Sequence, residues 1–286
     1  MAVTEKEEEE VVTPPLSCLL LQELCERETE LNTDPPPSLE GVEEILGYKF
    51  KNPNLLEEAF THSSIYYPMK PSPSNARLEY MGDSVLDLLI STELFFLYPD
   101  LSSGPLTRLR AANVDKEKLA RVAVNHGLHR YIRHKASHIE EQIREFSEAI
   151  LEYPIHSNGL VDTPKFLADI VESTIGAVFI DSNNSVDTVW KVFKGLLEPM
   201  ISLQTLGMHP VTELLELCQK HHLKIQFVKD AWEENTTVDV FVEDQLVGTS
   251  TYGLKKEIAQ NRAAKAALDN IKRKLVESNT TTIFDA

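Results

Sequence analysis

The chain has 286 residues, of which 42% are hydrophobic, so it can form two folded domains with cores of their own. No apolar run reaches the roughly 18 to 20 residues that a membrane-spanning helix needs. Three widely spaced cysteines, Cys18, Cys25 and Cys218, fit neither a disulfide framework nor a zinc site. The net charge of −17 argues against general polyanion binding, yet residues 253–274 hold seven Lys and Arg against two acids.

Residues 1–38 are predicted to form an acidic, weakly ordered arm. Residues 1–40 hold eleven Asp and Glu against two Lys and Arg, and Pro35 to Pro37 follow the acidic run. A short amphipathic helix over 16–24 would dock on a protein partner; the alternative is a solvated tail. The acidic start fits neither a secretory signal nor a transit peptide, so we expect the protein in the nucleus and/or the cytoplasm.

Residues 39–203 have a helical pattern. Ser38 is suited to cap a first helix, and Asn52-Pro53 opens a second. Further helices are expected over 76–97, 106–113, 116–126, 164–181 and 185–201. The predicted buried stripe of the long helix consists of Leu78, Met81, Val85, Leu88, Leu89 and Thr92.

Two stretches interrupt this helical pattern. Gly104-Pro105 is expected to break the chain, and 135–164 has turn signals at Pro154 and at Ser157-Asn158-Gly159. No convincing strand pattern occurs between residues 39 and 200. The sequence therefore predicts an all-α domain over 39–203.

After Gly207 the pattern changes to alternating strands between two helices. A helix is predicted over 212–221, strands over 224–229, 237–243 and 245–252, and an alanine-rich helix over 256–275. Val238, Val240 and Val242 share one face of the second strand. The order α-β-β-β-α predicts a compact α+β domain over 207–276, followed by a C-terminal tail over 277–286.

Two pairs of acids project from helical faces. Glu79 and Asp83 are four residues apart on the long helix, and Asp169 and Glu172 are three residues apart on a later one. Each pair borders an apolar stripe, where unpaired carboxylates are costly. Divalent cations would offset that cost, and an all-oxygen ligand set suits Mg²⁺ or Mn²⁺.

Four carboxylates from two helices could hold two metal ions that hydrolyse a phosphodiester bond. Spacing alone leaves open that both are ordinary solvated acid pairs. Asp87, one turn beyond Asp83, is interpreted as a partner of an N–H group or an arginine rather than as a ligand.

At these residues the sequence resembles the ribonuclease III family. The segments that carry the resemblance are 46–50 (LGYKF), 59–64 (AFTHSS), 75–87 (NARLEYMGDSVLD) and 164–173 (PKFLADIVES). It covers about 39–200 and is most similar to the plant ribonuclease-three-like proteins and to Dicer nuclease domains. The resemblance implies that Glu79, Asp83, Asp169 and Glu172 are the catalytic metal-site acids.

The resemblance also implies a homodimer, because two nuclease domains pair in the family and this chain has one. Tyr80 stands where relatives place an aromatic residue that fits the partner; the alternative for Tyr80 is ordinary core packing. Ala76 and Ser103 replace accessory acids of relatives, which puts the rate or the cleavage pattern in question more than activity itself. The stretch 135–163 is longer than in compact bacterial relatives.

Residues 208–275 resemble a double-stranded-RNA-binding domain, a module that reads the A-form shape of RNA. By that resemblance Thr212, Glu216 and Gln219 face the minor groove, while Lys255 and Lys256 bind phosphate at a helix N-terminus. The usual Gly-Pro-x-His loop is replaced by the acidic 230–235, and Glu257 takes a basic position. We therefore expect weaker RNA binding than a typical module gives.

Together these features predict a Mg²⁺-dependent endonuclease, with Mn²⁺ able to substitute, that acts on double-stranded RNA as a homodimer. The product ends would be 5′-phosphate and 3′-hydroxyl. The alternative is a non-catalytic, dimeric regulator that binds double-stranded RNA. The sequence does not specify the natural RNA.

Overall fold

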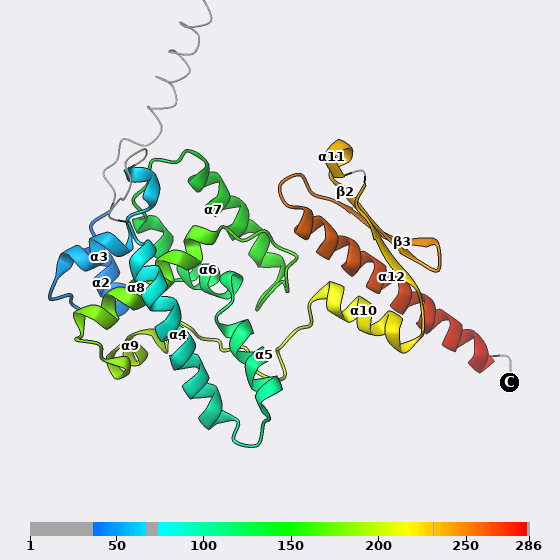
Figure 1. Ribbon diagram of the computed structural model, residues 1–286, viewed down its shortest axis with the longest axis horizontal. Coiled ribbons are helices and arrows are strands. Elements are labelled where there is room, and N and C mark those ends of the chain that lie inside the picture. The colour runs from blue at the N-terminus through cyan, green and yellow to red at the C-terminus, as the bar shows by residue number, and fades with distance from the viewer. Residues whose placement is uncertain (1–36, 67–73, 231, 285–286) are drawn as a thin grey trace, which may run out of the picture. The chain divides into compact units, whose positions relative to one another are not determined.

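The computed structural model describes residues 37–66, 74–230 and 232–284, with side chains up to Lys274 (Figure 1). The expected acidic arm, with its helix over 16–24, lies outside the described residues. None of the helices in these ranges has both the length and the apolar character that a bilayer crossing requires.

The first part of the described chain is helical. The elements are α2 (Glu40–Leu46), α3 (Pro53–Ala59), η1 (Ser63–Ile65), α4 (Ala76–Leu97), α5 (Ser103–Asn113), α6 (Lys116–Asn125), η2 (Leu128–Tyr131), α7 (His138–Ala149), η3 (Ile150–Glu152), α8 (Lys165–Asp181) and α9 (Val186–Phe193). An isolated bridge between Thr61 and Arg133 is the sole β-type pairing among the described residues up to 203. The all-α prediction is thus confirmed.

Several helix boundaries differ from the prediction. Helix α5 begins at Ser103, so Gly104-Pro105 opens a helix instead of breaking the chain, because the first turn has no use for the missing proline N–H. Helix α7 was predicted as irregular chain, yet Ile139, Ile143 and Phe146 form a buried stripe at helical spacing. Helix α9 ends at Phe193, eight residues earlier than expected.

The predicted buried stripe of α4 is correct only in part. Leu78, Val85 and Leu89 are buried, whereas Leu88 and Thr92 are exposed. The buried side also includes Gly82, Leu86, Ile90 and Leu94. The stripe is rotated because α8 packs along the side of α4 that carries Gly82.

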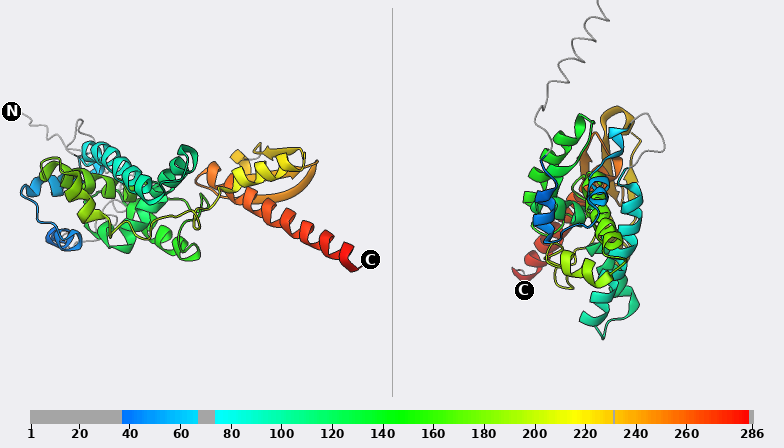
Figure 2. Two further views of the ribbon diagram at one scale, coloured as in Figure 1. Left: turned by 90° about the horizontal axis from the view of Figure 1, so that it is seen from below. Right: turned by 90° about the vertical axis from the view of Figure 1, so that its left-hand side faces the viewer.

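Helices α4 and α8 lie side by side and make the most extensive contact between helices (Figures 1 and 2). Two glycines permit this approach. A Cβ on Gly82 would collide with the backbone oxygen of Glu172, and a Cβ on Gly176 would collide with the backbone oxygen of Leu78. The absence of side chains at this crossing brings together the two helices that carry the acid pairs.

The second part of the chain is an α-β-β-β-α module. Helix α10 (Pro210–Lys220) precedes a sheet of β1 (Ile225–Val228), β2 (Thr237–Val242) and β3 (Gln245–Thr251), and α12 (Lys256–Phe284) follows. The strands are antiparallel in the order β1-β2-β3, with Ile225 opposite Val242 and Thr237 opposite Thr251. The register shifts between Val240 and Phe241.

One face of this sheet packs on the two helices. Val238, Val240 and Val242 are buried, as predicted from their alternation. Gly248 lets α12 approach β3, since a Cβ there would collide with the backbone of Ala263. Cys218 is buried in the same core, where burial raises the pKa of its thiol, and it packs as an apolar residue.

Two features of the module differ from the prediction. Helix α12 continues to Phe284, whereas the sequence predicted an end near residue 275 and a tail beyond it. The chain between β1 and β2 forms a short helix, α11 (Trp232–Asn235), where a loop was predicted.

Candidate metal centre and RNA-binding surface

Three of the four predicted acids meet in one place. Glu79 projects from α4, and Asp169 and Glu172 project from α8; one carboxylate oxygen of each lies within 4.8 Å of the other two. Asp83, one turn along α4 from Glu79, lies outside this triplet but lines the same hollow. The residues that line the hollow are Ala76, Glu79, Tyr80, Asp83, Lys116, Lys165, Ala168, Asp169 and Glu172.

A lysine that the sequence analysis did not single out lies among these acids. The Lys165 ammonium is 2.6 Å from Glu79 Oε1 and 2.5 Å from Asp169 Oδ1. Burial alone would lower its pKa, but the two carboxylates raise it. The available signal was its position one turn before Asp169, where a helical side chain faces the same side. Lys165 therefore acts as a counter-ion for two of the predicted metal-site acids.

The pKa values of Asp169 and Glu172, the two acids of α8, are both raised. Burial raises the pKa of Glu172 to about 8, and the nearby carboxylates of Asp83, Asp169 and Glu79 add to the rise. Burial also raises the pKa of Asp169, although its hydrogen bond from Lys165 opposes that rise. The four carboxylates of the hollow outnumber its two lysines, Lys116 and Lys165.

This donor set fits a hard divalent cation. All the converging ligand atoms are carboxylate oxygens, which Mg²⁺ and Mn²⁺ prefer, and the described residues offer no second such cluster of histidine, cysteine and acidic side chains. A divalent ion would offset the repulsion that raises the pKa of Glu172. Glu79, Asp169 and Glu172 would hold it, with Asp83 within the same hollow.

Asp87 takes the role predicted for it. Its Oδ1 lies 3.7 Å from the Arg110 Nε, and both side chains are partly exposed. Asp87 thus pairs with an arginine of α5 and is absent from the acidic triplet.

Helix α4 also exposes several large apolar side chains. Tyr80 is 76% exposed and Phe96 75% exposed, which excludes ordinary core packing for Tyr80 in the described chain. Leu88, Phe95 and Leu97 are exposed on the same helix. Large exposed apolar side chains that gather on one helix indicate a contact surface.

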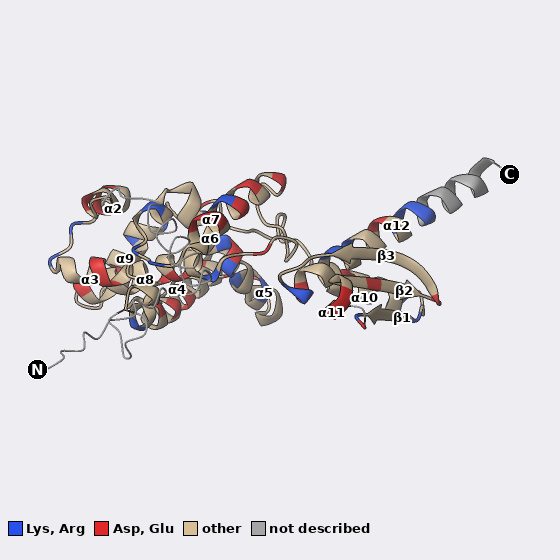
Figure 3. Ribbon diagram, turned by 90° about the horizontal axis from the view of Figure 1, so that it is seen from above, with Lys and Arg blue, Asp and Glu red and all other residues tan. Residues whose placement is uncertain are grey.

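The predicted RNA-binding residues lie at the surface of the module. Thr212, Glu216 and Gln219 are exposed on α10, and Lys255 and Lys256 are exposed at the start of α12. Lysine and arginine occur near both ends of the part of α12 whose side chains are described (Figure 3). The Lys256 ammonium lies 5.8 Å from the centre of the Trp232 ring. Trp232 belongs to the acidic 230–235 segment, so that segment contacts a predicted phosphate ligand directly.

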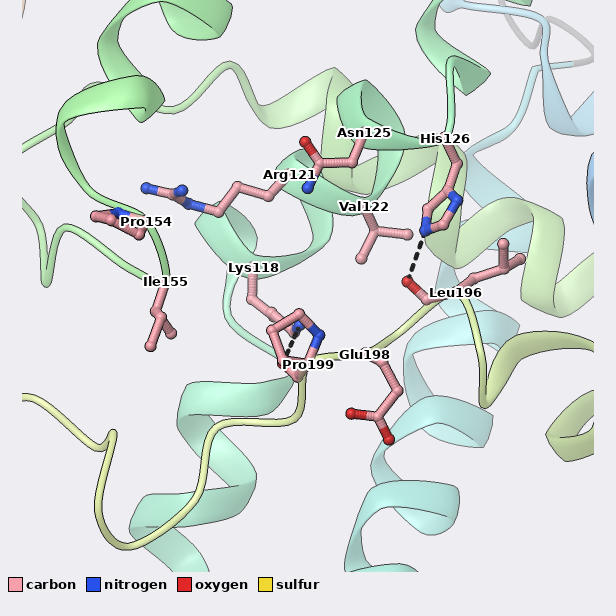
Figure 4. A pocket seen from close by; sticks show the side chains of 10 residues that line it. All are labelled: Lys118, Arg121, Val122, Asn125, His126, Pro154, Ile155, Leu196, Glu198 and Pro199. Atoms are coloured by element: carbon pink, nitrogen blue, oxygen red, sulfur yellow. Dashed lines mark hydrogen bonds between the residues drawn. The ribbon is translucent and has the colours of Figure 1, made fainter.

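A further hollow lies between α6 and the chain that follows α9 (Figure 4). There the Lys118 ammonium donates to the carbonyls of Leu197 at 2.7 Å and Pro199 at 2.8 Å, and the His126 ring bonds the carbonyl of Leu196. Burial lowers the pKa of Lys118 to about 8. The polar groups of this hollow hold the chain after α9 in place, which is a structural role.

Comparisons with known proteins identify both parts of the chain. The Ribonuclease III domain family matches residues 76–183, and the Double-stranded RNA binding motif matches residues 210–271. The chain is 56% identical to Ribonuclease 3-like protein 3 of Oryza sativa subsp. japonica, over 86% of this chain and 82% of that protein. It is 43% identical to Ribonuclease 3-like protein 2 of Arabidopsis thaliana, over 84% of this chain and 60% of that protein.

Among solved structures, the nuclease domain of ribonuclease III from Campylobacter jejuni is 30% identical, with a TM-score of 0.46 over 58% of this chain and 99% of that one. The matched families and the relative from Oryza sativa show that the chain belongs to the ribonuclease III family, as an endoribonuclease specific for double-stranded RNA with one nuclease domain and one double-stranded-RNA-binding motif.

Proposed function

We propose that the chain hydrolyses double-stranded RNA as a homodimer, with two Mg²⁺ ions held by Glu79, Asp83, Asp169 and Glu172. The convergence of Glu79, Asp169 and Glu172 within 4.8 Å is the observation that carries the proposal. When bound, two such ions supply an activated water and a stabilised 3′-oxygen leaving group. The expected ends are a 5′-phosphate and a 3′-hydroxyl.

The chain's own residues have three tasks at this site. The α4 and α8 acids supply oxygen ligands from a backbone that the Gly82 and Gly176 crossing holds rigidly. Lys165 offsets the charge of Glu79 and Asp169, a task that a bound divalent ion would share. Glu172, whose pKa is raised, would serve as a ligand in its charged form after it has released its proton to solvent.

The exposed apolar side chains of α4 support dimerisation. Tyr80 lines the acidic hollow and is also exposed, so a second copy that covers Tyr80 would lie beside the site. Burial of several aromatic and leucine side chains is a strong driving force for association. The partner is proposed to be a second copy of this chain.

The RNA-binding module would bring the duplex to this site. Its exposed residues Thr212, Glu216, Gln219, Lys255 and Lys256 come from α10 and the start of α12. Contacts of this kind recognise the 2′-hydroxyls and phosphates of a duplex rather than its base sequence. The module therefore supports duplex specificity and leaves the choice of RNA open.

Cleavage of a long RNA duplex tests the proposal. Purified protein with Mg²⁺ should give fragments with 5′-phosphate ends, and EDTA should prevent cleavage. Asp169→Asn should abolish cleavage while leaving RNA binding intact. Glu141→Gln, which removes an exposed acid from α7, should cut at the normal rate. Equal cleavage by Asp169→Asn and the parent chain would overturn the assignment.

A further inference from the structure

A turn between α7 and α8 contacts the N-terminal end of α12. Asn158 and Gly159 adopt positive φ angles of 56° and 87°, which produce a tight turn. A Cβ on Gly159 would lie 2.8 Å from His209 Nε2 and 2.9 Å from Asn261 Nδ2, so the contact requires glycine. The turn belongs to the stretch 135–163, which precedes α8.

The turn is fixed to the nuclease domain by a buried acid. Glu117 of α6 is 3% exposed and pairs with Arg121 at 2.7 Å. Its carboxylate also accepts hydrogen bonds from the Ser157 N–H at 2.8 Å and the Ser157 hydroxyl at 2.5 Å. A buried network with every group paired holds one geometry, so the turn is rigid at its start.

From this base the turn forms four polar contacts with the RNA-binding module. The Gly159 carbonyl accepts from the Asn261 amide at 2.8 Å, and the Leu160 carbonyl accepts from Arg262 at 2.9 Å. The Asp162 carboxylate accepts from the Lys255 ammonium at 2.5 Å and from the Tyr252 hydroxyl at 3.2 Å.

The contact between Lys255 and Asp162 has the greatest consequence for RNA binding. A phosphate of duplex RNA needs the same ammonium, at the same helix N-terminus, that Asp162 occupies. The Asp162 carboxylate offsets the charge of this ammonium, so a phosphate that approaches Lys255 meets a neutralised cation and a nearby negative charge. Lys256, which lies over the Trp232 ring instead, is outside this contact.

We propose that the segment Ser157–Asp162 is an autoinhibitory latch, in which Asp162 mimics an RNA phosphate and holds Lys255 until duplex RNA displaces it. The inference rests on the proposed role of Lys255 in RNA binding. The closed latch lowers the apparent affinity for RNA, because only the open population binds. Sufficient RNA shifts the population to the open state.

Binding of a 30-base-pair RNA duplex in EDTA, followed by fluorescence anisotropy, tests the latch. Asp162→Asn removes the charge but keeps the size and the acceptor for Tyr252. It should tighten binding roughly two- to fivefold, the effect of losing one partly exposed ion pair. In the Lys255→Ala variant, Asp162→Asn should leave the affinity for RNA unchanged, because the ammonium that Asp162 contacts is absent.

A matched control separates the latch from general charge effects. Asp269→Asn removes an exposed acid of α12 that pairs with Lys265 and lies outside the turn contact. Equal gains from Asp162→Asn and Asp269→Asn would overturn the latch, even if Lys255→Ala weakens binding as the proposed function requires. Unchanged binding by Lys255→Ala would overturn both the latch and the assigned RNA contact.

Discussion

Gly82 on α4 faces the backbone carbonyl of Glu172 on α8 so closely that a single added methyl group would force the two helices apart. The same crossing holds Glu79 one turn before Gly82 and Asp169 one turn before Glu172. The two helix backbones therefore determine the distance between the acids that are proposed to share metal ions.

Gly82→Ala should thus destabilise the fold and disrupt the site together. Overpacking at a backbone contact is expected to cost about 3 kcal/mol in the free energy of unfolding. Urea unfolding measures this loss. Gly104→Ala is the control, because an added Cβ there meets nothing within 4 Å. Equal stability of the two variants would contradict the close crossing.

Lys165→Met should make the thermal stability of the protein depend more strongly on Mg²⁺. Without the ammonium, Glu79 and Asp169 lose their counter-ion, so thermal stability in EDTA should fall by about 1 kcal/mol or less. The rise in melting temperature on adding Mg²⁺ should exceed that of the parent chain. Lys194→Met, which removes a comparable surface pair with Glu93, should show the parent response.

The raised pKa of Glu172 predicts a pH dependence of stability. Between its ordinary value of 4.5 and the native value of about 8, the folded protein holds a proton that the unfolded chain has released. Stability of the metal-free protein should therefore fall as pH rises through this window. Melting temperatures in EDTA at several pH values measure the fall.

Glu172→Gln removes this titration and should flatten the part of the curve that Glu172 contributes. The difference between parent and variant is the quantity to compare, since other groups titrate in both. Saturating Mg²⁺ should reduce the fall for the parent chain, because a bound cation favours the charged carboxylate. Parallel curves for parent and variant in EDTA would argue against the raised pKa.

Phe96→Asp should convert the proposed dimer to a monomer. A charge among the exposed apolar side chains at the C-terminal end of α4 cannot be buried against a second copy without a large cost. Sedimentation velocity measures the change in mass. Leu151→Asp, which alters a side chain that is 81% exposed on η3, should leave the oligomeric state unchanged. A parent chain that sediments as a monomer at high concentration would exclude this dimer.

The motifs predicted which acids line the site, but they did not predict the other residues around these acids. Glu79, Asp83, Asp169 and Glu172 line one hollow, as the two helical spacings suggested. Lys165 reaches Glu79 because α4 and α8 are neighbours. The periodicity of a single helix does not predict which helices pack together.

The errors on α4 have the same origin. Leu88 and Thr92 satisfy a helical stripe by spacing, but the actual buried side follows the path of α8 across Gly82. Helix α7 was missed because the turn signals around Ser157 dominated the interpretation of the whole stretch, although its own apolar period was present. Local patterns predicted that elements exist, and tertiary packing decided which faces they bury.

Helix α4 carries Glu79 and Asp83 of the acidic site together with exposed aromatic side chains, within a single run of 22 residues. In the proposed dimer, helix α4 would then set the offset between the cut positions on the two RNA strands. Changes in loop length elsewhere would leave that stagger unaltered. Every product would then have a single-stranded end of the same length.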